Sequence, residues 1–318
     1  MSVLVYTESE QGKLKKGALE VASYARAVAD KMGTTVTAVC INTADASTLG
    51  QYGVDKALTV QHDGGFNAKQ YAHYIKQAAE QEGAAVVIVS QSADSRYIAP
   101  ILSIGLNATY AANVIDVPET VSPFTVKRNT FTNKAIGLME MNSDHKILGV
   151  SSNAYGLHEQ SKDVSVESFS AETVSSGLEV KSVEKASGAV SIADAEIVVS
   201  GGRGLKGPEN WGMIEELAEI LGAATACSKP VSDLGWRPHS EHVGQTGKPV
   251  ASDLYIAIGI SGAIQHLAGI NASKVKVVVN TDPEAPFFKA ADYGVVGDAF
   301  EVVPQLIEKL KEFKAQNA

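Results

Sequence analysis

The chain has 318 residues, of which 45% are hydrophobic and 20% charged, and its formal net charge is −9. The length allows two domains, the composition is typical of a soluble globular protein, and the acidic balance argues against a nucleic-acid partner. No apolar run approaches the roughly 18 residues of a membrane-spanning helix. Since the N-terminal sequence begins directly as a strand, with no signal or transit pattern, we expect a cytoplasmic protein.

Strands and helices alternate through the first hundred residues. The hydrophobic pattern predicts strands at 3–6, 36–41 and 86–89, and helices at 18–32, 71–78 and 98–104. Gly33 should end the first helix. The uninterrupted apolar run at 86–89 is typical of a strand covered on both faces. This alternation predicts a nucleotide-binding-like α/β domain built on a parallel sheet, although it carries no phosphate-binding motif.

The pattern changes after Pro118. Residues 120–150 predict antiparallel strands that extend the first sheet, and residues 156–193 predict one or two exposed strands followed by a linker. We therefore expect an N-terminal α/β domain at 1–190, the candidate surface for docking a partner subunit, and a second domain at 191–318.

The second domain predicts a doubly wound parallel sheet. We expect strands at 197–199, 254–258, 275–279 and 295–296, a helix at 213–221 that ends at Gly222, and a closing helix at 300–310 with a frayed tail. Cys40 and Cys227 lie beside apolar runs and are expected to be buried thiols rather than a disulfide.

The stretch 242–269 contains three parts of a nucleotide site in sequence. A polar Gly-rich loop at 243–248 precedes the strand at 254–258, which continues through Gly259 into 261–266, the expected first turns of a helix. Small residues at such a switch leave backbone N–H groups uncovered, and the helix dipole favours a phosphate there. Further donors and acceptors come from Gln245, Thr246, Gln265 and His266. The pattern predicts a bound nucleotide-like anion.

Three other kinds of site fit less well. The glycines at 202, 204 and 207 match a dinucleotide fingerprint, but Ser228 and Lys229 stand where an NAD site needs an acidic residue. Residues 244–248 resemble half of a P-loop that His242 and Pro249 then exclude.

A hydrolase elbow would need glycine at Ala263. A triad of Ser261, His266 and Asp282 is disfavoured because Ser261 and His266 point to different sides of one helix. The remaining histidines show no metal-ligand spacing, so no metal is predicted.

Five separated segments, 200–204, 243–248, 259–266, 277–286 and 291–294, resemble the electron transfer flavoprotein alpha subunit in their order. The resemblance is dense over about 195–316 and only general over 1–190. It implies an FAD site in the second domain. The contacts it implies are Arg203, Ser228, Lys229, Val243, Gly244, Gln245, Thr246, Ser261, Gly262, Ala263, Ile264, Gln265, His266, Asn280, Asp298 and Ala299.

The resemblance also implies individual roles. Thr246 is expected near N5 and the C4 carbonyl of the flavin, His266 near the C2 carbonyl, and Asn280 and Asp298 near the adenosine. Arg203 as a surface residue, His266 as a core histidine and Asp298 as a helix N-cap remain alternatives.

Lys229 departs from the family pattern, which has arginine beside the flavin ring. Lysine keeps the positive charge but loses the planar, stacking guanidinium, so the resemblance leaves the tuning of the flavin open. A solvated surface lysine before Pro230 is the other interpretation.

The implied function is that of an electron carrier without a substrate of its own. It would form a heterodimer with a beta subunit that carries AMP, accept electrons from dehydrogenases such as the acyl-CoA dehydrogenases of fatty acid β-oxidation, and pass them to a membrane quinone oxidoreductase. The alternatives are the alpha subunit of an NADH-dependent electron-bifurcating flavoprotein, an FAD-storing module and, least favoured, a hydrolase.

Overall fold

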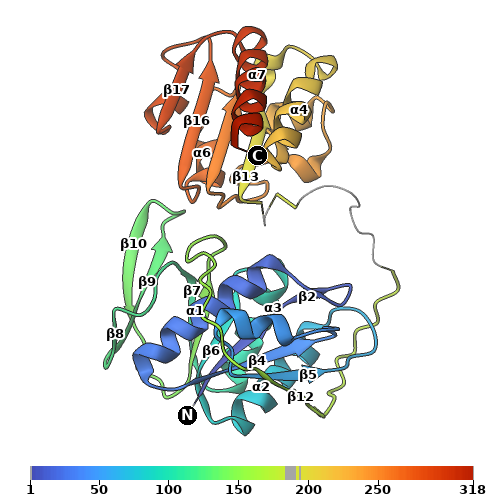
Figure 1. Ribbon diagram of the computed structural model, residues 1–318, viewed down its shortest axis with the longest axis vertical. Helices are drawn as coiled ribbons and strands as arrows, with labels where there is room; N and C mark the ends of the chain where they lie inside the picture. The colour runs from blue at the N-terminus through green and yellow to red at the C-terminus, as the bar shows by residue number, and fades with distance from the viewer. Residues whose placement is uncertain (1, 183–190, 193–194, 318) are drawn as a thin grey trace. The chain divides into compact units, whose positions relative to one another are not determined.

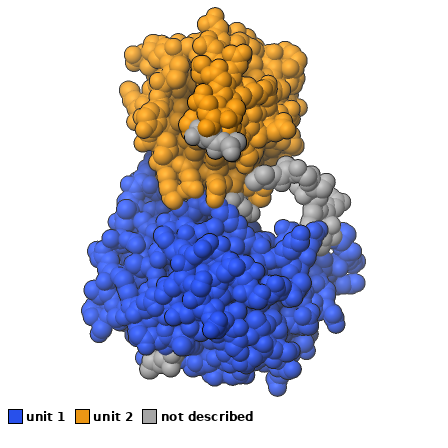
Figure 2. Space-filling model, viewed as in Figure 1, with its two compact units in different colours: residues 1–185 blue, residues 186–318 orange. Residues whose placement is uncertain are grey.

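The computed structural model describes residues 2–182, 191–192 and 195–317. The chain forms two compact units, residues 1–185 and 186–318, which we call the N-terminal and C-terminal units (Figure 2). The domain boundary predicted near residue 190 falls at the edge of 183–190, outside the described residues. No helix in the described part of the chain is long and apolar enough to cross a membrane.

The N-terminal unit is built around a sheet of ten strands (Figure 1). The strands of the unit are β1 (Ser2–Thr7), β2 (Ser9–Glu10), β3 (Lys13–Leu14), β4 (Thr35–Ile41), β5 (Lys56–Val60), β6 (Ala84–Ser90), β7 (Thr109–Val114), β8 (Thr120–Val121), β9 (Phe124–Thr130), β10 (Ala135–Glu140), β11 (Lys146–Val150) and β12 (Ser165–Ser168). The helices are α1 (Lys16–Met32), η1 (Ser47–Tyr52), α2 (Ala68–Gln81) and α3 (Ala93–Gly105). Strands β2 and β3 form a separate hairpin.

The sheet order β10-β9-β7-β11-β6-β1-β4-β5-β12 confirms a parallel α/β core with an antiparallel extension. Strands β8, β9 and β10 pair antiparallel, as predicted for 120–150. The prediction was wrong for the end of that region, because β11 lies between β6 and β7 and pairs parallel with both. Its run KILGV is buried from Ile147 onward, which is typical of a central strand rather than an edge hairpin.

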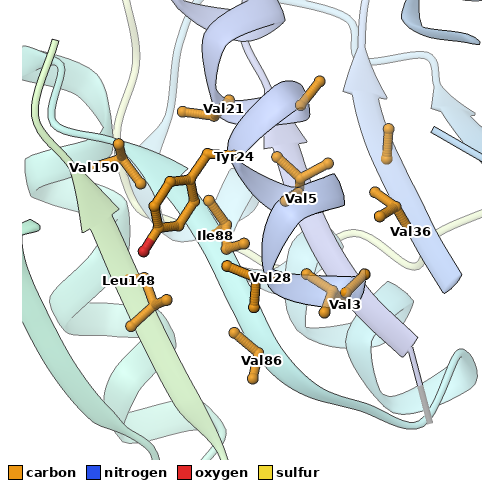
Figure 3. Close-up of a cluster of buried hydrophobic side chains, with 14 of the residues drawn as sticks. Val3, Val5, Val21, Tyr24, Val28, Val36, Val86, Ile88, Leu148 and Val150 are labelled. Carbon is orange, nitrogen blue, oxygen red and sulfur yellow. The ribbon is translucent and has the colours of Figure 1, made fainter. Parts of the chain in front are cut away.

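Alternating residues of β1 face two different helical layers. Val3 and Val5 pack with α1, whereas Leu4 and Tyr6 pack with α2 and α3. In Figure 3, Tyr24 of α1 lies in the apolar cluster with residues of β6 and β11. The helix ends where expected, since Gly33 adopts the left-handed conformation at its C-cap.

A buried carboxylate lies where the strand order reverses in this sheet. Glu8 follows β1, beside the end of β6, and it is 5% exposed. Its Oε1 accepts hydrogen bonds from the hydroxyls of Ser90, Ser92 and Ser95 at 2.5, 2.5 and 2.8 Å, and its Oε2 lies 3.4 Å from Nζ of Lys15. The carboxyl ends of strands at such a reversal are where open α/β sheets bind ligands. In the N-terminal unit the carboxylate of Glu8 itself occupies this position and accepts the hydrogen bonds there.

Glu20 plays a similar part after β11. It projects from α1, is 5% exposed, and accepts hydrogen bonds of 2.9 Å from the backbone N–H groups of Asn153, Tyr155 and Gly156. Two groups of donors near the carboxyl ends of β6 and β11 are therefore satisfied by carboxylates of the chain itself.

We predict that Glu8→Ala destabilises the N-terminal unit by roughly 3 kcal/mol, because three hydroxyls lose a charged acceptor inside the protein. Urea unfolding of the full chain measures the change. Glu159→Ala, at an exposed position of the same unit, is the control and should lie within about 0.5 kcal/mol of the unsubstituted protein. Equal losses in both variants would contradict the structural role of Glu8.

The C-terminal unit is a five-stranded parallel sheet in the order β14-β13-β15-β16-β17 (Figure 1). The strands are β13 (Ile197–Gly201), β14 (Ala224–Cys227), β15 (Leu254–Ile258), β16 (Val275–Asn280) and β17 (Tyr293–Val296). The helices are η2 (Arg203–Leu205), η3 (Pro208–Asn210), α4 (Gly212–Leu221), α5 (Lys229–Asp233), η4 (His239–Glu241), α6 (Ile264–Ile270), η5 (Pro286–Lys289) and α7 (Ala299–Asn317).

Both faces of this sheet are covered, which confirms the doubly wound arrangement. Val199 and Ile256 pack with α4, α5 and α7, whereas Val198 and Tyr255 pack with residues of α6 and η5. The short strand β14 and helix α5 were not predicted. The predicted fraying of the tail was wrong, since α7 continues to Asn317.

The start of α6 was also predicted wrongly. The helix begins at Ile264, not Ser261, because Gly259 and Gly262 have φ angles of 63° and 84°, which a right-handed helix cannot contain.

Candidate functional site

All five parallel strands of the C-terminal unit end at one edge of the sheet. The chain enters at β13, crosses to β14 on one side, and then to β15, β16 and β17 on the other. The reversal lies between β13 and β15, which is the place where sheets of this kind bind ligands. Most of the residues predicted to contact a cofactor follow the ends of these strands.

Glycines allow the two loops at the reversal to touch. The N–H of Gly202 donates to the carbonyl of Ile258 at 2.9 Å, and the N–H of Gly204 donates to Gly259 at 3.1 Å. A Cβ on Gly202 would lie 2.1 Å from the Gly259 oxygen, and one on Gly204 would lie 2.6 Å from its Cα. Side chains larger than hydrogen would separate the loops, so these glycines close the dinucleotide-like turn.

A row of unpaired backbone donors follows β15. Within the described chain, no hydrogen bond is formed by the N–H groups of Ser261, Gly262, Ala263 or Ile264. The positive φ at Gly262 lets the chain turn here, and Ser261 and Ala263 are exposed. Successive unpaired N–H groups in such a turn are able to bind an anion such as a phosphate group.

The loop at 243–248 is fixed against this region from two sides. The N–H of Val243 donates to Cys227 at the end of β14 (3.0 Å), and the N–H of Gln245 donates to the Gln265 carbonyl in α6 (2.7 Å). Gly244 lies against Gly269, where a Cβ would be 2.5 Å from the Gly244 Cα. The loop thereby joins the β14 end to α6.

Several predicted contacts extend into solvent around this edge. Arg203, Lys229, Gln245, Thr246 and Ser261 are exposed. Ser228 is buried, and its N–H donates to the Gly201 carbonyl at 3.1 Å, which fixes the position of Lys229 beside β13. The five exposed side chains are therefore available to a ligand.

Asn280 and Asp298 are engaged within the chain. Asn280 donates from Nδ2 to the Ile260 carbonyl (3.0 Å), and its Oδ1 accepts from the Asp282 N–H (3.0 Å). Asp298 accepts from the Phe300 N–H at 3.0 Å and so caps α7, as the alternative interpretation held, while Ala299 is buried in its first turn.

Lys206 was not singled out from the sequence. Its Nζ lies 3.7 Å from Asp298 Oδ2 and 4.7 Å from the centre of the Phe300 ring. A positive φ of 67° at a non-glycine residue marks this turn, and no sequence pattern reports it.

His266 is 6% exposed, and its Nε2 lies 3.0 Å from the hydroxyl of Tyr255, which is completely buried. Burial lowers the pKa of His266 to about 4, nearby His242 adds to this effect, and an interaction with the backbone of Val243 opposes it. Burial likewise lowers the pKa of His242. At neutral pH His266 is therefore an uncharged ring.

The arrangement does not support hydrolysis. Ser261 is exposed while His266 is buried and bonded to Tyr255, so the two do not form a nucleophile–base pair. Among the described residues, no group of three or more His, Cys, Asp or Glu side chains could hold a metal ion. Both cysteines are free and buried, as predicted.

A doubly wound sheet with unpaired backbone donors at its strand reversal is typical of a nucleotide- or dinucleotide-binding α/β protein. Comparison with known families is more specific. The electron transfer flavoprotein domain matches residues 3–174, and the electron transfer flavoprotein FAD-binding domain matches residues 191–271. The chain belongs to the electron transfer flavoprotein alpha-subunit family, and its C-terminal unit contains the family's FAD-binding domain.

Relatives of similar length support this assignment. The electron transfer flavoprotein subunit alpha of Thermoanaerobacterium thermosaccharolyticum is 34% identical over 98% of both chains, and that of Bacillus subtilis is 35% identical over 98% of this chain and 97% of its own. The mitochondrial subunit alpha of Arabidopsis thaliana is 57% identical over 39% of this chain and 34% of its own.

We predict that acid destabilises the C-terminal unit through His266. Its pKa is about 4 in the folded chain and 6.5 in the unfolded one, so only the unfolded chain is protonated between these values. The stability is therefore complete above pH 6.5 and falls by about 1.4 kcal/mol per pH unit down to about pH 4. Urea unfolding at several pH values measures this slope.

The comparison protein is His266→Gln. Its unfolding free energy should depend less steeply on pH between 4 and 6.5, by the contribution of one proton, about 1.4 kcal/mol per pH unit. His242 contributes in the same direction and is present in both proteins. The same slope in both proteins would show that His266 is protonated equally in the folded and unfolded chains.

Proposed function

We propose that this chain is the FAD-carrying subunit of a two-subunit electron carrier. The observation that carries the proposal is the row of unpaired N–H groups at 261–264, placed at the strand reversal of the FAD-binding domain. These donors would hold the pyrophosphate. The adenosine would lie toward Asn280, Asp298 and Ala299, and the flavin ring toward Arg203, Lys229 and Thr246.

FAD supplies the redox chemistry when bound, and the protein supplies position and charge. Exposed polar side chains at 245–246, together with Arg203 and Lys229, surround the edge of the sheet without being engaged in its core. The buried, neutral His266 would face the ring from α6, with Val243, Gly244, Gln265 and Ile264 completing that side. We assign the binding of FAD to residues 191–318 and the docking of the partner to residues 1–190.

The partner would be the electron transfer flavoprotein beta subunit, which would carry AMP. Dehydrogenases such as the acyl-CoA dehydrogenases of fatty acid β-oxidation would donate electrons, and a membrane quinone oxidoreductase would accept them, with the carrier in the cytoplasm. Two anion positions of the N-terminal unit are filled by Glu8 and Glu20, which supports a docking rather than a nucleotide-binding role for that unit.

Reduction by NADH separates this function from electron bifurcation. The purified complex should contain one FAD and should not be reduced by NADH alone. A second FAD, together with rapid reduction by NADH, would identify a bifurcating enzyme instead.

We predict that the full chain alone binds little FAD and that adding the beta subunit restores one FAD per complex. The site described above has exposed side chains on its open side, so a second wall is needed to cover the flavin ring. Absorption spectra after gel filtration measure the flavin content. A monomer saturated with FAD would contradict the proposed pairing.

The assignment of FAD binding to the C-terminal unit can be tested with a fragment of residues 191–318 mixed with the beta subunit. It should retain measurable affinity for FAD, because all the candidate contacts lie within it. Residues 1–190, treated in the same way, should bind none. Flavin bound by the second fragment would sink the assignment of FAD to the C-terminal unit.

We predict that Lys229→Ala lowers the potential for adding the first electron to the flavin by tens of millivolts. A unit charge about 6 Å from the ring is worth roughly 3 kcal/mol at an effective dielectric constant near 20, or roughly 100 mV for one electron. Solvent around an exposed lysine reduces this value. FAD content should change little, and Lys229→Arg should maintain or raise the potential.

Redox titration of the complex measures the effect. Lys309→Ala is the control, since that lysine is exposed on α7 and pairs with Glu312 at 2.7 Å. If Lys229→Ala and Lys309→Ala give the same potential, Lys229 does not act on the flavin.

A further inference from the structure

Tyr255 and His266 form a buried polar pair in an otherwise apolar cluster. Tyr255 comes from β15 and is completely buried, and its hydroxyl lies 3.0 Å from His266 Nε2. Phe287 flanks the imidazole with a ring-centre distance of 6.1 Å and offers no polar atom. Apart from Tyr255, no side chain in the described chain forms a hydrogen bond with this imidazole.

The hydroxyl of Tyr255 carries a proton at all ordinary pH values, because burial raises its pKa well above 10. Among the described residues Nε2 of His266 is the one hydrogen-bond partner of this hydroxyl, since the buried Oγ of Ser200 makes no hydrogen bond. The hydrogen of the Tyr255 hydroxyl is therefore satisfied inside the protein only when it is donated to Nε2 of His266. A neutral imidazole that accepts at Nε2 carries its proton on Nδ1.

The other side of the imidazole is consistent with this assignment. Nδ1 is buried and makes no hydrogen bond of good geometry with the described residues. A proton on Nδ1 leaves one polar group, this N–H, without a partner. With the proton on Nε2 instead, both the lone pair of Nδ1 and the hydrogen of the Tyr255 hydroxyl would be buried without a partner, so the Nδ1 tautomer leaves fewer polar groups unsatisfied.

We propose that Tyr255 is the positioning residue of His266, which fixes the orientation of the ring and keeps the proton of the neutral imidazole on Nδ1. Its relevance to the flavin rests on the proposed function, because His266 is among the proposed FAD contacts. His266 then presents a fixed dipole of known direction to the bound cofactor rather than a positive charge. The hydrogen bond of Tyr255 thereby links β15 to α6.

Nitrogen NMR of the flavin-free full chain, labelled at histidine, tests the proposal. The two ring nitrogens give different shifts according to which of them carries the proton. We expect the unsubstituted protein at pH 7 to show His266 protonated on Nδ1, with His266→Gln providing the assignment. A proton found on Nε2 overturns the proposal, whether or not Tyr255→Phe folds.

Tyr255→Phe then tests the cause. Removing the hydroxyl should reduce the preference for Nδ1 by about threefold to tenfold, the effect of one hydrogen bond. Two controls separate this effect from packing. Phe287→Leu changes the apolar contact with the ring, and Tyr293→Phe removes a hydroxyl from a residue that is 67% exposed. Both should keep the tautomer of the unsubstituted protein.

An unchanged tautomer in Tyr255→Phe, or an equal change in Phe287→Leu, overturns the positioning role. In the complex, Tyr255→Phe should shift the flavin potential while the FAD content stays constant. Absence of flavin from the unsubstituted complex would instead refute the proposed function and leave the tautomer result intact.

Discussion

The close approach of the backbone after β13 to the backbone after β15 is the contact on which the site depends. Gly202, Gly204 and Gly259 have no room for a Cβ. In the loop after β13, the N–H groups of Gly202 and Gly204 donate to carbonyl groups at the end of β15 and just after it. This packing fixes where the second loop leaves the sheet. The row of free N–H groups at 261–264 and the start of α6 follow from it, because a chain held at Gly259 must turn again at Gly262 before it can become helical.

Beneath the exposed polar side chains of this edge lies one buried pair of polar side chains, Tyr255 and His266. The Tyr255 hydroxyl and Nε2 of His266 form a buried hydrogen bond between β15 and α6, and Val243 belongs to the same buried cluster as Tyr255. Since an unpaired buried polar group is costly, such a pair persists only with good geometry. The exposed side chains at the rim, Lys229 among them, can therefore change without disturbing the groups beneath it.

Much of this arrangement is predictable from the sequence, for identifiable reasons. The strand at 254–258 and the helix ends at Gly33 and Gly222 follow from apolar runs and left-handed glycines. The antiparallel extension follows from the change of composition after Pro118. The first loop of the site follows from its glycine spacing, although the spacing alone favours NAD as much as FAD.

Other features depend on contacts between distant segments. The helical assignment of Ser261 failed because Gly262 packs against the backbone of Phe287, where a Cβ would be 2.4 Å from the Phe287 N. The parallel position of β11 depends on its two neighbours rather than on its own residues. The partnership of Tyr255 with His266 has no local signal, since a tyrosine within an apolar strand is ordinarily a packing residue.

Glu8 and Glu20 have a consequence for the way the chain responds to its surroundings. A ligand that binds only the folded state adds stability in proportion to the logarithm of its concentration, whereas an acceptor tethered to the fold is present at a constant effective concentration. The N-terminal unit has such tethered acceptors, and the C-terminal unit must take its anion from solution. Scarcity of FAD therefore removes the acceptor of the C-terminal unit, whereas Glu8 and Glu20 remain in place in the N-terminal unit whatever the supply of the cofactor.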